Sequence, residues 1–178
     1  MDIGGSVQTL EGRVKSFKPD EYVILDNGSE EKSHEKWNKP DIEYDINQEI
    51  TIPKDDPYIG WTNFDQIFMI EVSEYLYDPL QALKNINQLL KKGGVFYSSW
   101  HFLYCQHPPK GKDFLRYTPD AVEFLHKKAG FKIIEHIPRV LKDDFSKSTL
   151  MALVTNEGMR GWKEFDNTII GSIVKARK

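Results

Sequence analysis

The 178-residue sequence has one cysteine, no long apolar run and no excess of charge of either sign. Because Cys105 cannot form an internal disulfide, the sequence favours a reducing compartment and a cytoplasmic protein. No apolar run approaches the ~20 residues that a membrane-spanning helix needs. The N-terminus also lacks the basic-then-apolar order of a secretion signal. We therefore expect a soluble protein without a membrane partner.

The charge balance argues against a nucleic-acid partner. Twenty-four Lys and Arg residues stand against 27 Asp and Glu, giving a net charge of −3, so no general basic field attracts a phosphate backbone. Hydrophobic residues make up 39% of the chain and charged residues 29%, which excludes wholesale disorder and permits one buried core. The length fits a single domain.

Short apolar runs alternate with helical patterns along the chain. A helical stripe over 7–17 ends before Pro19, another helix begins at Pro79 and closes at 91–93, and a third begins at Thr118 and stops at Gly130. The expected strands lie at 1–3, 22–25, 42–46, 67–70, 95–99, 131–137 and 149–155. This alternation predicts an α/β fold with a mostly parallel sheet and helices on both faces, and an antiparallel pair at the end of the chain.

The C-terminal residues are assigned to a separate tail. Trp162, Phe165, Ile169 and Ile173 recur at helical spacing, which predicts a helix with one apolar face. We therefore divide the chain into a domain over 1–156 and a helical tail over 157–178. The apolar face would bury against the domain or against a second copy, which would give a homodimer.

Three acidic residues end three of the expected strands beside a glycine turn. Gly4 and Gly5 separate the first strand from the first helix, where backbone N–H groups and the positive helix end suit an anionic ligand. Asp26 follows Gly4 by 22 positions, a spacing that places a carboxylate near ribose hydroxyls. Asp2 and Asp45 end the neighbouring strands. The set favours an adenosine-type ligand, while a tight turn at Gly4 and an Asp26 that only forms a turn remain the alternatives.

The middle of the chain resembles the class I S-adenosylmethionine-dependent methyltransferases of the small-molecule type. The motifs that carry the resemblance are FDQIFMIEVSEYL at 64–76, DPLQAL at 78–83, LLKKGG at 89–94, HPP at 107–109, DFLRYTP at 113–119 and AGF at 129–131. The resemblance covers residues 1 to 155, and its subgroup is associated with sugars and other small metabolites. It implies a Rossmann-like methyltransferase sheet of seven strands whose last strand is antiparallel.

The resemblance also implies roles for individual residues toward S-adenosylmethionine. Asp2, Gly4 and Gly5 would hold the methionine part, and Asp26 would hold the ribose. Asp45 with Ile46 would hold the adenine, and Glu71 would lie under the sulfonium. The pattern departs from the family at Ser6 and Gln8, where members usually carry glycine, and the usual residues before the first strand are missing.

The segment from Trp100 to Tyr117 is the expected acceptor site, since it follows the fifth strand at the cofactor edge. Methyl transfer is an in-line displacement that needs positioning and a base for the acceptor hydroxyl. His107 is the predicted base because imidazole titrates near neutral pH. Arg116 and Asp113 complete the predicted catalytic set, with Arg116 orienting either the loop or an acidic acceptor group.

Several alternatives stay open at this stage. His101 is the next candidate for the base, and His107 with Asp113 could simply brace the loop while Arg116 pairs with an acid. The five histidines show no ligand spacing, so we expect no metal.

The sequence thus predicts a methyltransferase acting on an oxygen or a nitrogen of a small molecule, such as a sugar or glycan precursor. The alternative is a binding or scaffold protein of this fold that has lost catalysis. A nicotinamide-dependent enzyme is disfavoured because G-x-G-x-x-G is missing.

Overall fold

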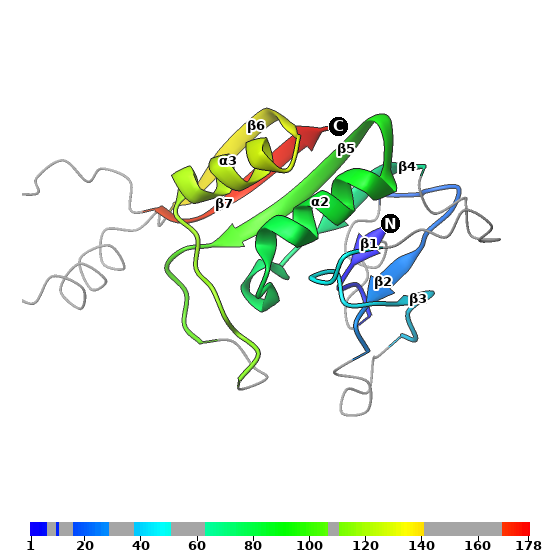
Figure 1. Ribbon diagram of the computed structural model, residues 1–178, viewed down its shortest axis with the longest axis horizontal. Helices are drawn as coiled ribbons and strands as arrows, with labels where there is room; N and C mark the ends of the chain where they lie inside the picture. The colour runs from blue at the N-terminus through cyan, green and yellow to red at the C-terminus, as the bar shows by residue number, and fades with distance from the viewer. Residues whose placement is uncertain (7–9, 11–15, 29–37, 51–62, 107–110, 141–168) are drawn as a thin grey trace, which may run out of the picture.

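The computed structural model describes residues 1–6, 10, 16–28, 38–50, 63–106, 111–140 and 169–178 (Figure 1). None of the helices in these ranges has the length and apolar character needed to cross a membrane. The helix expected over 7–17 and the strand expected over 149–155 fall largely or wholly outside the described ranges.

The described strands form one seven-stranded sheet in the order β3-β2-β1-β4-β5-β7-β6. The strands β1 to β5 are parallel to one another, whereas β7 is antiparallel to both β5 and β6. This confirms the predicted mostly parallel sheet with an antiparallel last strand. The strands are β1 (Asp2–Ile3), β2 (Ile24–Asp26), β3 (Ile42–Glu43), β4 (Phe64–Met69), β5 (Leu90–His101), β6 (Lys132–Val140) and β7 (Ile169–Arg177).

Two α-helices lie side by side on one face of this sheet (Figure 1). Helix α2 (Pro79–Leu89) begins with Asp78, whose carboxylate accepts the Gln81 N–H at 3.0 Å. Helix α3 (Pro119–Lys128) begins with Thr118, whose hydroxyl accepts the Ala121 N–H. Both starts match the predicted capping residue followed by proline in the first turn. A short 3₁₀ turn, η2 (Ser73–Tyr75), follows β4.

Helix α2 ends earlier than expected. The sequence places its end at 91–93, but Leu90 already has extended dihedral angles and is the first residue of β5.

The buried core lies between the sheet and the two helices. Its completely buried members include Ile67 and Met69 from β4, Phe96 and Trp100 from β5, Leu83 and Ile86 from α2, and Val122 from α3.

The prediction of a helical tail is wrong for the described residues, because Ile169 and Ile173 lie on strand β7. A spacing of four residues puts two side chains on one face of a helix, and equally on one face of a strand. The β-branched pairs Ile169–Ile170 and Ile173–Val174 favour the strand. Since β7 lies between β5 and β6, residues 169–177 belong to the same sheet as the rest of the fold, and the boundary at 156 does not hold. Trp162 and Phe165 lie outside the described residues.

Candidate active site

The carboxyl ends of the parallel strands β1 to β4 meet at one edge of the sheet, where ligands bind in open α/β folds. The chain turns after β1 at Gly4, which has a φ of 74°. A Cβ atom on Gly4 would lie 2.5 Å from Cγ2 of Val72, in the segment that follows β4. A side chain at Gly4 would therefore force apart the glycine turn and the segment after β4.

Asp26 lies next to this turn, as the sequence predicts. The Ser6 N–H donates to Oδ2 of Asp26 at 3.4 Å, which joins the end of β2 to the glycine turn. Asp26 is half-buried, and no other described residue donates to its carboxylate. The Ser6 hydroxyl is buried without a hydrogen-bond partner among the described residues. The half-buried carboxylate of Asp26 and the buried hydroxyl of Ser6 thus belong to residues that contact each other at the glycine turn.

Asp2 has a different position from the other two acids. It is 4% exposed, and its Oδ2 accepts the Leu10 N–H at 2.9 Å and the Tyr22 hydroxyl. Its Oδ2 would also lie 2.7 Å from a Cβ atom on Gly5. The Asp2 side chain therefore shapes the inside of the glycine turn, so that any contact with the methionine part would come from the turn's backbone.

Asp45 lies beyond the end of β3 and is held by its neighbours. Oδ1 accepts both the backbone N–H and the side-chain amide of Asn47, and Oδ2 accepts the Tyr77 hydroxyl at 2.7 Å. Burial alone would raise the pKa of Asp45, but the hydrogen bonds from Tyr77 and Asn47 outweigh it and lower the pKa. The Gln48 side chain also contributes to this lowering, so the Asp45 carboxylate is held by its own loop and by Tyr77. Ile46 beside it is buried.

Glu71 follows β4 and has the one positive φ among the described non-glycine residues, 60°. Its Oε1 accepts the Ser99 hydroxyl at 2.8 Å and an Arg139 N–H at 2.9 Å, and its backbone N–H donates to Ser99 Oγ. Burial alone would raise the pKa of Glu71. The hydrogen bonds with His101 and Ser99 and the charges of His101 and Arg139 outweigh burial and lower this pKa to about 2. Glu71 is therefore a fixed anion at this edge.

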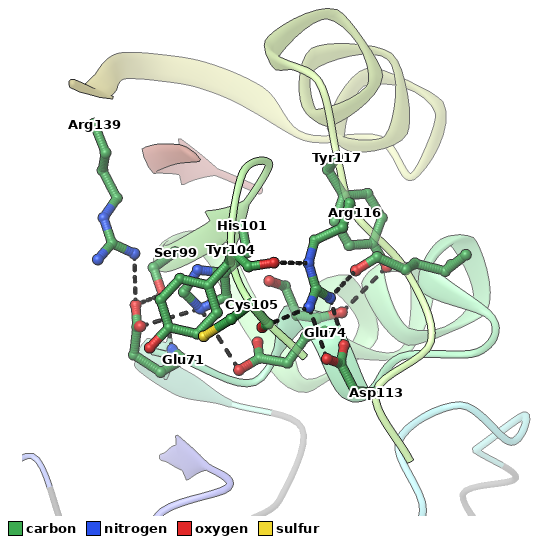
Figure 2. Close-up of polar contacts among 12 residues, drawn as sticks. Glu71, Glu74, Ser99, His101, Tyr104, Cys105, Asp113, Arg116, Tyr117 and Arg139 are labelled. Atoms are coloured by element: carbon green, nitrogen blue, oxygen red, sulfur yellow. Dashed lines mark hydrogen bonds and ion pairs between the residues drawn. The ribbon is translucent and has the colours of Figure 1, made fainter. Parts of the chain in front are cut away.

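His101, at the end of β5, connects Glu71 with a second acid. Its Nε2 lies 3.0 Å from Oε2 of Glu71 and 3.5 Å from Oε1 of Glu74. His101 and Glu74 are each 1% exposed, and the Tyr104 ring stacks on the imidazole at 4.4 Å. Figure 2 shows the two carboxylates converging on His101. Of the two histidines considered as the base, His101 is the one that the structure places at the predicted edge, while His107 lies outside the described residues.

Arg116 and Asp113 form a clamp within the loop after β5. The guanidinium pairs with both oxygens of Asp113, and its remaining N–H groups donate to the carbonyls of Tyr104, Cys105 and Leu115. All five N–H donors of an arginine are then used. This geometry matches the bracing alternative, and it leaves Arg116 no donor for an acceptor group.

Sequence reasoning missed three residues of this cluster. Glu74 lies within the motif at 64–76 and Ser99 ends an expected strand, so both carried a local signal. Arg139 carried none, because it is 68 residues from Glu71 in the chain. Within the described ranges, no group of three or more His, Cys, Asp or Glu side chains is arranged to hold a metal ion.

Comparison with known proteins gives a family and a fold. Residues 2–96, just over half of the chain, match the family model described as a methyltransferase domain. No curated protein matches the sequence. An S-adenosylmethionine-dependent methyltransferase from Mesorhizobium loti is 15% identical, with a TM-score of 0.63 over 99% of this chain and 89% of that one.

Other solved structures share the fold at similar identity. An S-adenosylmethionine-dependent methyltransferase from Archaeoglobus fulgidus is 11% identical, with a TM-score of 0.60 over 99% of this chain and 84% of that one. The [4+2]-cyclase SpnF is 14% identical, with a TM-score of 0.56 over 99% of this chain and 73% of that one. Likeness at such identities shows the fold alone.

Proposed function

This chain belongs to the methyltransferase domain family, and from that premise we propose that it moves a methyl group from S-adenosylmethionine to an oxygen or a nitrogen of a small molecule. A sugar or glycan precursor is the acceptor we favour within that class. The exposed free thiol of Cys105 suits a reducing, cytoplasmic setting. Family membership makes the protein an enzyme of methyl transfer, and S-adenosylmethionine as its cofactor and the class of acceptor are the parts we propose.

The observation that carries the proposal is the meeting of the glycine turn with Asp26. The turn approaches within hydrogen-bond distance of a carboxylate that ends the next strand, as a nucleoside site requires. Asp26 is half-buried and accepts one hydrogen bond from the described residues, so lone pairs remain on its carboxylate for two ribose hydroxyls. Asp45 lies next to the apolar Ile46 beyond the end of β3, where the adenine ring would lie. These residues fit the cofactor.

The remaining residues supply position and charge. Bound S-adenosylmethionine supplies an electrophilic methyl group. Glu71 presents a fixed carboxylate at the same edge, and the clamp of Arg116 with Asp113 holds the loop that the acceptor must pass. We keep His107 as the proposed base that takes the acceptor proton, with His101 as its competitor, because imidazole accepts a proton near neutral pH.

Calorimetric titration with S-adenosylhomocysteine tests the cofactor site. Losing a charge-assisted hydrogen bond costs roughly 1.5–3 kcal/mol, or about ten- to a hundred-fold in affinity. Asp26→Ala should weaken binding on that scale without unfolding the protein. Asp20→Ala, which removes an exposed carboxylate, is the matched control and should bind as the wild type does. Equal affinity of the two variants would remove Asp26 from the site.

Turnover with labelled S-adenosylmethionine tests the base. General-base catalysis contributes about 10²–10⁴-fold, so His107→Ala should lower turnover by that order and leave affinity for S-adenosylhomocysteine intact. If His101→Ala alone gives this result, the base is His101. If the wild type gives no heat with S-adenosylhomocysteine, the chain is a scaffold of this fold that has lost the cofactor.

A further inference from the structure

Two arginines lie beside the candidate site, and they differ in how their N–H groups are used (Figure 2). Arg116 donates all five to the protein. Arg139 donates one, from Nη1 to Oε1 of Glu71 at 2.9 Å, and no other described residue accepts from it. A guanidinium presents its donors as a planar fork. The Nε–Nη2 edge of Arg139 is therefore unused within the described part of the chain.

Arg139 lies beside a glycine of the neighbouring strand. In the sheet register, Arg139 of β6 and His101 of β5 are both paired with Gly171 of β7. A Cβ atom on Gly171 would lie 3.4 Å from Cδ of Arg139 and 2.3 Å from the Trp100 carbonyl oxygen. The first distance is an ordinary van der Waals contact, whereas the second is a clash, so glycine at 171 lets β7 lie close to the β5 backbone beside Arg139.

The Arg139 guanidinium is held but not enclosed. Its side chain is 31% exposed and that of Glu71 is 38% exposed, so water or a ligand reaches both. Glu71 is in turn held by Ser99 and by His101. The arginine is thus anchored through Nη1, and its second edge is available at the edge of the sheet where the acceptor must lie.

We propose that the Nε–Nη2 edge of Arg139 binds an anionic group, a carboxylate or a phosphate, of the methyl acceptor. Such groups match the two parallel N–H bonds of an arginine edge, and these charge-assisted pairs are stronger than neutral ones. Glu71 occupies Nη1 and leaves this edge to the ligand, so the arginine bridges a protein carboxylate and the acceptor. The sequence predicts that Arg116 orients either the loop or an acidic acceptor group; we assign the second of these roles to Arg139, because the N–H groups of Arg116 are used within the loop. The inference rests on the proposed function, since it names the class of acceptor.

Titration with inorganic phosphate at constant ionic strength tests anion binding without any activity. The wild type should bind phosphate, as measured by calorimetry and by a rise in melting temperature. Arg139→Gln should weaken this binding at least tenfold. Arg177→Gln, which removes an exposed arginine near the other end of β7, should bind as the wild type does. Undiminished binding by Arg139→Gln, or no binding by the wild type, overturns the proposal.

Acceptors offered in pairs then test the role in methyl transfer. Each pair contains one skeleton with and without the anion, such as glucose with glucose 6-phosphate and galactose with galacturonate. The wild type should prefer the anionic member, and Arg139→Gln should raise its KM about ten- to a hundred-fold while leaving the KM of the neutral member unchanged. An equal loss on both members would assign Arg139 to holding Glu71 alone, which overturns the inference.

Binding of S-adenosylhomocysteine distinguishes a failure of the proposed function from a failure of the proposal for Arg139. If the wild type binds it and Arg139→Gln binds it within about twofold, the cofactor site is intact and the phosphate titration decides the role of Arg139. If the wild type does not bind it, the proposed function fails. The phosphate result then still shows whether Arg139 is an anion site.

Discussion

His126 is a titratable side chain that the fold encloses in its aromatic core. It is fully buried against the rings of Phe96, Trp100 and Phe131, and its Nδ1 lies 2.7 Å from the Val122 carbonyl oxygen. Burial disfavours the imidazolium and lowers the pKa of His126 to about 4, although the contact with Val122 opposes the shift. The residue is therefore neutral in the folded protein at physiological pH.

The depressed pKa makes stability depend on pH. Between pH 6.5 and 4 the unfolded chain binds a proton at His126 that the folded chain does not, so this contribution is complete above about 6.5 and is lost as pH falls toward 4. The loss should be on the order of 3 kcal/mol, as measured by urea unfolding at several pH values. His126→Phe should flatten the dependence in this window.

His136→Gln provides the comparison for this prediction. His136 lies on β6 with Nδ1 3.3 Å from Oε1 of Glu123, on the surface of α3. Because the charge of His136 adds a minor part to the lowering of the His126 pKa, its replacement should reduce the slope between pH 4 and 6.5 far less than His126→Phe does. A slope that persists in His126→Phe would assign the acid sensitivity to other groups.

Helix α2 organises the segment after β3 through one buried side chain. The amide nitrogen of Asn85 donates to the carbonyls of Ile46 at 2.8 Å and Gln48 at 2.5 Å. Its oxygen accepts the Ile50 N–H at 3.2 Å and the side chain of Gln81. Asn85 is completely buried. If its side chain were removed, water could not take over its hydrogen bonds with these backbone groups. The helix thereby fixes the backbone that carries the predicted adenine contacts.

Removing this side chain should destabilise the protein and loosen the cofactor site. Asn85→Ala leaves buried carbonyls unpaired, which should lower the free energy of unfolding by about 1–3 kcal/mol and weaken binding of S-adenosylhomocysteine. Lys84→Ala, on the exposed side of the same helix, should change neither. Denaturant unfolding and calorimetry measure the two effects. A variant as stable as Lys84→Ala would contradict the role given to Asn85.

The elements that the sequence could predict are those with local signals. The proline after a capping residue marks the starts of α2 and α3, and apolar runs mark most of the strands. The end of α2 and the identity of β7 were missed because the deciding factors are distant. Leu90 pairs with Phe64, and the four-residue spacing of Ile169 and Ile173 fits a strand as well as a helix.

The same limit applies to the site. Gly4 and Asp26 could be found because spacing within one strand–turn–strand unit determines where they meet. Arg139 could not, since its approach to Glu71 depends on the order in which β5, β7 and β6 lie in the sheet. Arg116 was found as a residue, but its saturation by loop carbonyls is visible only in three dimensions.

In the whole molecule, β7 is an interior strand that pairs with β5 on one side and β6 on the other. Truncation after Thr168 would remove it and leave both neighbours with unpaired backbone groups. We expect such a chain to lose its cooperative thermal transition, as followed by circular dichroism. The full-length chain is the control. A truncated chain that melts at the same temperature would show that the sheet closes without β7.

Light scattering on the full-length chain tests the homodimer expected from the sequence. The argument for it used an apolar helical face in the tail, and two members of that face, Ile169 and Ile173, belong to β7 instead. Ile173 is 42% exposed on the sheet and could still meet a second copy. The dimer stays a prediction, and a monomeric mass would reject it.

The position of β7 also bears on the order of events during synthesis. Of the described strands it is the last to leave the ribosome, yet it is the one that joins β6 to the rest of the sheet. Until it emerges, β5 and β6 have open edges that can pair with the wrong strands. The sheet therefore cannot close until residues 169–177 have emerged, and a chaperone that shields these edges until then would raise the yield of folded enzyme.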